Sequence, residues 1–117
     1  MAAIALKRVY EPASKSDGRR LLVERLWPRG MKKDKARIDT WHKNVAPSPE
    51  LRTWYGHDVE KWTEFKKRYR QELKKNVEGV QAIRDEILLG KVTFVYAARD
   101  EAHNSALVLK EFLEKKA

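Results

Sequence analysis

Cysteine is absent from this chain. Its absence excludes a disulfide framework, a thiol nucleophile and a cysteine-ligated zinc ion. The three histidines lie far apart in the sequence without HExxH spacing, so we expect no metal site. Neither the phosphate-binding pattern GxxxxGKS/T nor the dinucleotide pattern GxGxxG occurs, so no cofactor is predicted. Ser105 is not surrounded by a nucleophile-elbow motif, which argues against a serine hydrolase.

Long apolar runs are also missing. Uninterrupted runs such as residues 1–6 and 94–98 fall far short of the roughly 20 residues that a membrane helix needs. The first run is also too short for a signal peptide. We therefore expect a soluble, cytoplasmic protein without a membrane partner. A chain of 117 residues predicts one domain, residues 1–117, which buries roughly 65% of its unfolded surface.

Positive charge is abundant and unevenly distributed. The chain has 26 Lys and Arg against 17 Asp and Glu, a net charge of +9. Residues 7–43 hold 12 basic against 5 acidic residues, and residues 59–75 hold 7 against 3. Such clustering is typical of a surface that faces polyanions, although a solvated basic face that aids solubility has the same composition. Nucleic acid is therefore one candidate partner.

Three segments have the pattern of strands. Residues 4–9 and 20–27 have the pattern of short strands early in the chain, and residues 92–97 form the strongest strand signal. The near-continuous apolar character of 20–27 suits burial on both faces, and Pro28 is expected to end that strand. The turn between the first two strands is short for a parallel crossover, so both an antiparallel pair and a tight crossover remain open.

Helices occupy most of the segment between the second and third strands. Ser48 and Pro49 predict a helix start, and Gly56 predicts its end. Further apolar periodicity predicts helices from Asp58 through Leu73, over residues 78–89, and from an Asp100 cap to the C-terminus. The fold class is therefore α/β: one domain with a small, mainly parallel sheet of three to four strands flanked by about four helices.

The carboxyl end of the second predicted strand carries ionisable residues. Strand alternation would put Glu24 and Leu26 on one face and Arg25 and Trp27 on the other. Arg25 and Arg29 could hold a phosphate or carboxylate by bidentate hydrogen bonds. The alternative is an internal salt bridge from Glu24 beside a turn.

A second polar cluster follows the third strand. Asp100 would serve as a helix cap, which needs no further function. His103 would then lie in the first helical turn, where the helix dipole disfavours a protonated imidazole, so a neutral ring able to act as a base or ligand is expected. Arg99 and Asn104 flank these two residues.

A third cluster lies between two predicted helices. Trp54 and His57 could form part of a pocket or stack a base. The alternative is structural, with Trp54 in the core, Gly56 ending a helix and Asp58 starting the next.

Three runs carry a family resemblance: LLVERLWPRG, WYGHDVEKWTEFKKRYRQEL and VTFVYAARDEAHNSALVLKEFL. Together they resemble the YeaO-like branch of domain-of-unknown-function family 488. The resemblance implies a small, intracellular, bacterial-type α/β domain and no established activity. Members usually have aspartate where this chain has Glu24, and the broader family tends to carry cysteine where this chain has Ala98, which rules out a thiol mechanism. The pattern residues are Glu24, Arg25, Trp27, Pro28, Arg29, Trp54, Gly56, His57, Asp58, Arg99, Asp100, His103 and Asn104.

Two functional hypotheses follow. In the first, the carboxyl ends of the second and third strands adjoin and form a site for a phosphorylated or nucleotide-like anion. Acid–base chemistry there would come from His103, Asp100 and Glu24, and binding from Arg25, Arg29, Trp54, His57, Arg99 and Asn104. In the second, a basic helix face binds nucleic acid through Lys66, Lys67 and Arg70. Neither hypothesis establishes an enzyme, and both a monomer and a homodimer fit the sequence.

Overall fold

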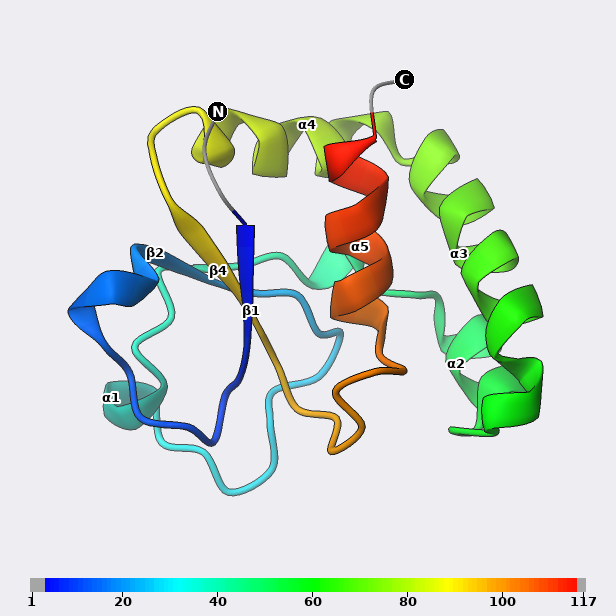
Figure 1. The fold of residues 1–117 in the computed structure, drawn as a ribbon, viewed down its shortest axis with the longest axis horizontal. Helices are drawn as coiled ribbons and strands as arrows, with labels where there is room; N and C mark the ends of the chain where they lie inside the picture. The colour runs from blue at the N-terminus through cyan, green and yellow to red at the C-terminus, as the bar shows by residue number, and fades with distance from the viewer. Residues whose placement is uncertain (1–3, 116–117) are drawn as a thin grey trace.

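A computed structural model describes residues 4–115 and shows a four-stranded sheet in which every pairing is parallel (Figure 1). The strand order is β1-β4-β2-β3. The strands are β1 (Ile4–Arg8), β2 (Arg19–Leu22), β3 (Thr40–Trp41) and β4 (Val92–Tyr96). The predicted α/β class and parallel sheet are confirmed.

The central strand β4 pairs with both β1 and β2. Leu6 and Leu21 lie on either side of Phe94, and all five residues of β4 are buried. The first two strands are therefore parallel to each other but separated by β4. A short crossover suffices because each strand spans only about 17 Å, while ten extended residues reach about 33 Å. Gly18 ends this crossover at φ +65°, where a Cβ would lie 2.3 Å from the Lys91 carbonyl oxygen.

The second strand is shorter than predicted. It ends at Leu22 rather than at residue 27, so the predicted alternation of side chains over residues 24–27 is wrong. Beyond Leu22 the Val23 amide still donates to the Val95 carbonyl at 3.4 Å, but at the next residue a side chain replaces the backbone. The Ala97 amide donates to the Glu24 carboxylate at 2.9 Å. Leu26 is 64% exposed. The two-residue strand β3 was not predicted, because two residues carry no periodicity.

Within residues 4–115 five α-helices accompany the sheet, one more than expected. The additional helix, α1, is a single turn in the basic segment before β3. Ser48 caps α2 by accepting from the Leu51 amide, and Gly56 ends it in the left-handed region, as predicted. The helices are α1 (Lys33–Ala36), α2 (Pro49–Tyr55), α3 (Trp62–Lys75), α4 (Val77–Ile87) and α5 (Ser105–Glu114), with 3-10 turns η1 (Lys15–Asp17), η2 (Lys43–Val45) and η3 (Val59–Lys61).

The helix after β4 begins later than predicted. Asn104, not Asp100, caps α5: its Oδ1 accepts from the Leu107 amide at 2.9 Å, and its Nδ2 donates to two loop carbonyls. Asp100 accepts the amides of Ala102 and His103 in a preceding loop. His103 therefore lies outside the helix, and the argument from the helix dipole does not apply to it.

The two faces of the sheet are covered unequally. Helices α2 to α5 pack on one face, where Leu21, Phe94 and Tyr69 lie in the main hydrophobic core (Figure 1). The other face is met by a much smaller cluster around Val9 and Val95, next to α1 and η1. None of the helices within residues 4–115 is long and apolar enough to cross a bilayer.

Candidate functional site

A cavity of about 300 Å³ opens at the carboxyl ends of β2 and β4, where parallel α/β sheets commonly bind ligands. We call it the strand-end cavity. It is built from the segments that follow the two strands, from the end of α2 and from the start of α5. Its lining residues are Glu24, Pro47, Arg52, Tyr55, His57, Phe65, Ala97, Ala98, His103, Asn104 and Ser105.

An aspartate–histidine pair forms one side of the strand-end cavity. Nδ1 of His103 lies 2.9 Å from Oδ2 of Asp100, and the imidazole meets the Trp62 ring edge-on at 5.2 Å. Partial burial raises the pKa of Asp100, but the Ala102 amide and the His103 imidazole outweigh it and hold that pKa below its ordinary value. Asp100 thus stays ionised and orients His103, whose Nε2 has no partner within residues 4–115.

Glu24 forms the opposite, buried side of the cavity. Burial raises the pKa of its carboxyl above the ordinary value, against the Ala97 amide and the positive charges of Arg52 and His57. The carboxylate is held in place by the 2.9 Å hydrogen bond from the Ala97 amide. Glu24 is therefore the acidic group of this wall that takes up a proton most readily.

An arginine and a histidine come to the cavity from the end of α2 and the residues just after it. Arg52 lies in the last turns of the helix and His57 follows the Gly56 cap in the left-handed region, at φ 59°. Reasoning from the sequence missed Arg52, because an exposed arginine within a short helix looks like an ordinary solvated side chain. Tyr55, also missed, takes the wall position expected for Trp54.

The two arginines expected to bind an anion do not line this cavity. Arg25 instead donates to the Ala46 carbonyl at 3.0 Å and to the Pro47 carbonyl at 3.2 Å, and so fixes the segment before α2. Arg29 is exposed, and its carbonyl accepts from the Tyr10 hydroxyl at 2.9 Å. The expected meeting of these arginines with Asp100 and His103 rested on a strand that continues past Leu22, which it does not.

Other expected binding residues are also placed differently. Trp54 lies between Lys61 and Arg68, whose charged groups are 5.1 and 4.1 Å from its ring. Arg99 is exposed in the loop after β4. Asn104 lines the cavity, but its side-chain amide is engaged in capping α5. The structure therefore brings together Glu24, His57, His103 and Asn104, with Asp100 behind His103.

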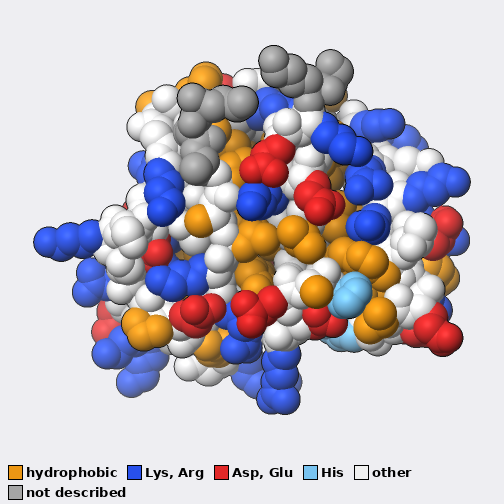
Figure 2. Space-filling view, viewed as in Figure 1, with side chains coloured by type: hydrophobic (Ala, Val, Ile, Leu, Met, Phe, Trp, Pro, Cys, Tyr) orange, Lys and Arg blue, Asp and Glu red, His pale blue; other side chains and the backbone are white. Residues whose placement is uncertain are grey.

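The basic face expected to bind nucleic acid lies on α3. Figure 2 shows Lys and Arg side chains gathered over this helix. Lys67 is exposed, whereas the ammonium of Lys66 lies 5.6 Å from the centre of the Trp62 ring. Arg70 is half-buried and 3.9 Å from Glu111. Part of this positive charge thus already has protein partners.

The strand-end cavity offers hydrogen-bond donors and cations but little reactive chemistry. His103 Nε2, the Arg52 guanidinium and the His57 ring can contact a bound molecule, and Ala97 and Ala98 leave space above β4. No group of three His, Asp or Glu side chains within residues 4–115 is placed to hold a metal ion. The arrangement suits recognition of a small polar molecule.

Fold and cavity define a small parallel α/β domain with a polar pocket at its strand ends. The chain belongs to the family described as the inactive DUF488-N3 subclade, which matches residues 3–117. It is similar to the uncharacterized protein YeaO of Escherichia coli, with 40% identity over 94% of this chain and 96% of that protein. An uncharacterized protein of Mycobacterium tuberculosis is 42% identical over 94% of this chain and 92% of its own length. No solved structure matches.

Proposed function

We propose that the protein is a binding domain for a small anionic molecule, a phosphate or a carboxylate, seated in the strand-end cavity. The observation that carries the proposal is the Asp100–His103 pair, 2.9 Å apart, which presents a free Nε2 beside Arg52 and His57. A guanidinium and imidazoles recognise oxyanions by charge-assisted hydrogen bonds. The volume of about 300 Å³ suits a small molecule.

The observations favour a domain that binds an anion without converting it chemically. The matching subclade is described as inactive. Ala98 lines the cavity at the position where the resemblance implies cysteine in the broader family. A site that keeps its shape and its donors but lacks this nucleophile would still recognise a ligand. Sensing or sequestering an anion is therefore favoured over catalysis.

The test is an NMR titration of the wild type with inorganic phosphate and with acetate, each at constant ionic strength. We expect saturable shifts of the amides of Ala97, Ala98 and Ser105. Arg52→Ala and His103→Ala should each weaken binding about tenfold, the equivalent of about 1.4 kcal/mol. Both variants should keep their melting temperatures within about 2 °C, because neither side chain is in the core.

Arg29→Ala is the matched control, since it removes an exposed arginine outside the cavity and should leave affinity unchanged. Glu24→Gln should tighten binding, because it removes a negative charge from the wall. Affinity should rise as the pH falls, because burial raises the pKa of Glu24 and its protonation removes a negative charge from the wall. Equal weakening by Arg29→Ala and Arg52→Ala, or no saturable shift at millimolar anion, would refute the proposal.

A second candidate function is nucleic-acid binding by α3. The observation that favours it is the gathering of basic side chains over this helix (Figure 2). These side chains project from a helix that is already packed against α5, so the face is rigid and needs no rearrangement to meet a phosphate backbone.

A further inference from the structure

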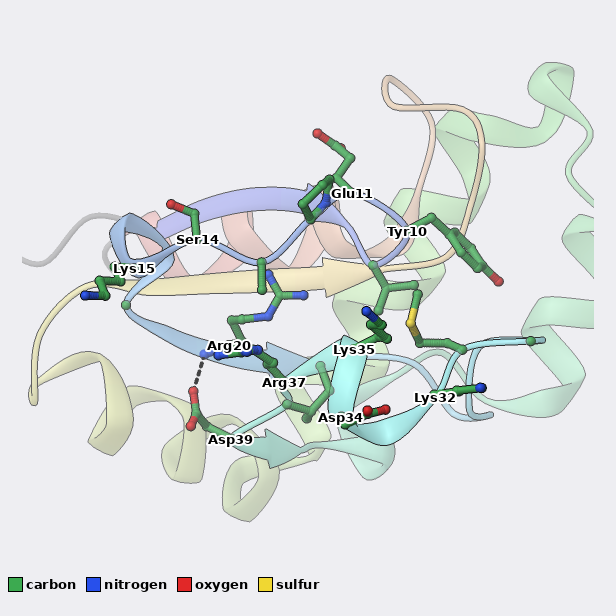
Figure 3. A pocket seen from close by; sticks show the side chains of 17 residues that line it. Tyr10, Glu11, Ser14, Lys15, Arg20, Lys32, Asp34, Lys35, Arg37 and Asp39 are labelled. Carbon is green, nitrogen blue, oxygen red and sulfur yellow. Dashed lines mark hydrogen bonds between the residues drawn. The ribbon is translucent and has the colours of Figure 1, made fainter.

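A second, larger hollow of about 1220 Å³ lies on the thinly covered face of the sheet. It is bounded by the crossover from β1 to β2 on one side and by the segment around α1 on the other (Figure 3). We call it the basic hollow. Its lining residues are Val9, Tyr10, Glu11, Pro12, Ala13, Ser14, Lys15, Gly18, Arg20, Gly30, Met31, Lys32, Asp34, Lys35, Arg37, Ile38 and Asp39.

A buried arginine lies at the base of the basic hollow. Arg20 is 3% exposed; its Nη1 donates to Asp17 at 2.6 Å and its Nε to the Ala36 carbonyl at 2.9 Å. Within residues 4–115 its Nη2 has no hydrogen-bond partner, and the guanidinium points into the space between η1 and α1 (Figure 3). Buried donors are seldom left unpaired, so this group has room for an acceptor that the described residues do not supply.

Two carboxylates and two cations lie around the base of the basic hollow. One carboxylate, Asp17, faces two cations, because Lys7 lies 3.1 Å from its Oδ1 while Arg20 binds its Oδ2. Asp39 is the second carboxylate: it is exposed, lines the hollow and accepts from the Arg20 amide at 2.7 Å.

The rim adds further positive charge. Four exposed basic side chains surround the opening: Lys15, Lys32, Lys35 and Arg37. Three acidic side chains also line the hollow, Glu11, Asp34 and Asp39, against five basic ones when Arg20 is included, so a net positive charge remains. Glu11 accepts from the Arg8 amide. Arg37 adopts the left-handed region at φ 49°, which is costly for a residue with a side chain. The fold thus keeps an arginine on the rim where glycine would fit the backbone better.

One wall of the basic hollow is apolar and fixed. The Tyr10 ring is 43% exposed, its hydroxyl donates to the Arg29 carbonyl at 2.9 Å, and the Arg8 guanidinium lies 5.1 Å from its centre. Met31 and Ile38 contribute further apolar surface. A buried guanidinium with one donor to spare, a net basic rim and an aromatic wall match a molecule with a phosphate at one end and a flat ring at the other.

We propose that the basic hollow binds an organic phosphate of nucleotide size, at a site separate from the strand-end cavity. The phosphate lies toward Arg20, Lys35 and Arg37, and the ring lies against Tyr10. The separation between the two sites follows from their lining residues, which have no member in common.

The experiment is an NMR titration of the full chain with adenosine monophosphate, with adenosine as the probe that lacks the phosphate. We expect saturable shifts of amides in residues 10–18 and 31–39, and about tenfold weaker binding of adenosine. Lys35→Ala should weaken binding of the monophosphate about fivefold. Lys33→Ala is the matched control: it removes the same charge from α1 at a residue that does not line the hollow, and affinity should stay unchanged.

The variant Arg37→Gly distinguishes a loss of affinity from a loss of stability. Glycine accepts the left-handed backbone without cost, so this variant should melt at the same temperature as the wild type or higher, yet bind the monophosphate about fivefold more weakly. If Lys33→Ala and Lys35→Ala weakened binding of the monophosphate equally, the binding would be diffuse attraction to surface charge and the proposal would be overturned. Amide shifts confined to residues 97–105 would also overturn it, because they would place the ligand in the strand-end cavity.

Discussion

At the scale of single residues, Glu24 combines a structural and a functional role. Its carboxylate accepts a hydrogen bond from the Ala97 amide just beyond the end of β2. Its side chain also forms one side of the strand-end cavity. Burial nevertheless raises its pKa, so the charged form is held in the folded protein at a cost.

Glu24→Gln is therefore expected to stabilise the protein near neutral pH. The wild type recovers stability as the pH falls through the raised folded-state pKa of Glu24, and the recovery is complete below the ordinary value of 4.5. The advantage of the variant in melting temperature should thus narrow as the pH approaches 4.5. Thermal melts across this pH range measure the difference.

Glu64→Gln is a control for which we expect the opposite change in melting temperature. Its hydrogen bond to Arg68 is the main cause that lowers the pKa of Glu64, so the wild-type carboxylate adds stability above its ordinary pKa and loses it in acid. This variant should melt slightly below the wild type near neutral pH and converge with it in acid. If Glu24→Gln also melted below the wild type at neutral pH, the account of Glu24 as a costly buried charge would be wrong.

At the scale of elements, the start of α5 decides how the strand-end cavity is built. Asn104→Ala should lower the free energy of unfolding by about 1–2 kcal/mol, because it removes the cap of a buried helix end. Asp100→Ala should cost clearly less stability, since its side chain is 44% exposed. It should instead weaken anion binding by releasing His103. Urea denaturation of both variants measures the stability difference.

Equal losses of stability in the two variants would mean that Asp100 and Asn104 share the capping role. The sequence contains both candidate caps four residues apart, and both have the right side chain. What selects Asn104 is the packing of the helix: Ala106, Val108 and Leu109 are fully buried, which sets where the first turn begins.

The misread end of β2 has a similar cause. Val23, Leu26 and Trp27 continue the apolar character beyond Leu22, and apolar character alone does not tell a strand from a buried loop. The Glu24 carbonyl accepts from the Trp41 indole of β3 at 2.6 Å, so a side chain rather than a strand backbone bonds the chain there. Because Arg25 and Arg29 lie beyond this point, the expected anion-binding arginines were misplaced, whereas the short-range features of α2 were predicted well.

At the scale of the whole molecule, the excess of positive charge is divided between α3 and the basic hollow. Binding of duplex DNA is expected at low salt and should weaken steeply as salt rises. Replacing Lys66, Lys67 and Arg70 together by alanine should reduce the slope of log affinity against log salt by about 3. Fluorescence anisotropy over a salt series measures this slope.

The matched control replaces three exposed lysines away from α3: Lys33, Lys91 and Lys115. It makes the same change in net charge and should leave the slope nearly unaltered. An equal effect of both triple variants would show attraction to net charge alone, and no binding at low salt would exclude nucleic acid as a partner of this face.

The sequence by itself determined the α/β class, the positions of β1 and β4, and the limits of α2. Each depends on residues within a few positions of one another, such as the cap at Ser48 and the glycine at Gly56. It also indicated the strand-end region through Glu24, His57 and His103. Only the tertiary structure decided the strand order, the end of β2, the start of α5 and the entry of Arg52 into the cavity. It also decided that Nη2 of Arg20 has no partner among residues 4–115. These depend on contacts between distant segments, such as Leu21 against Phe94, which local patterns do not encode.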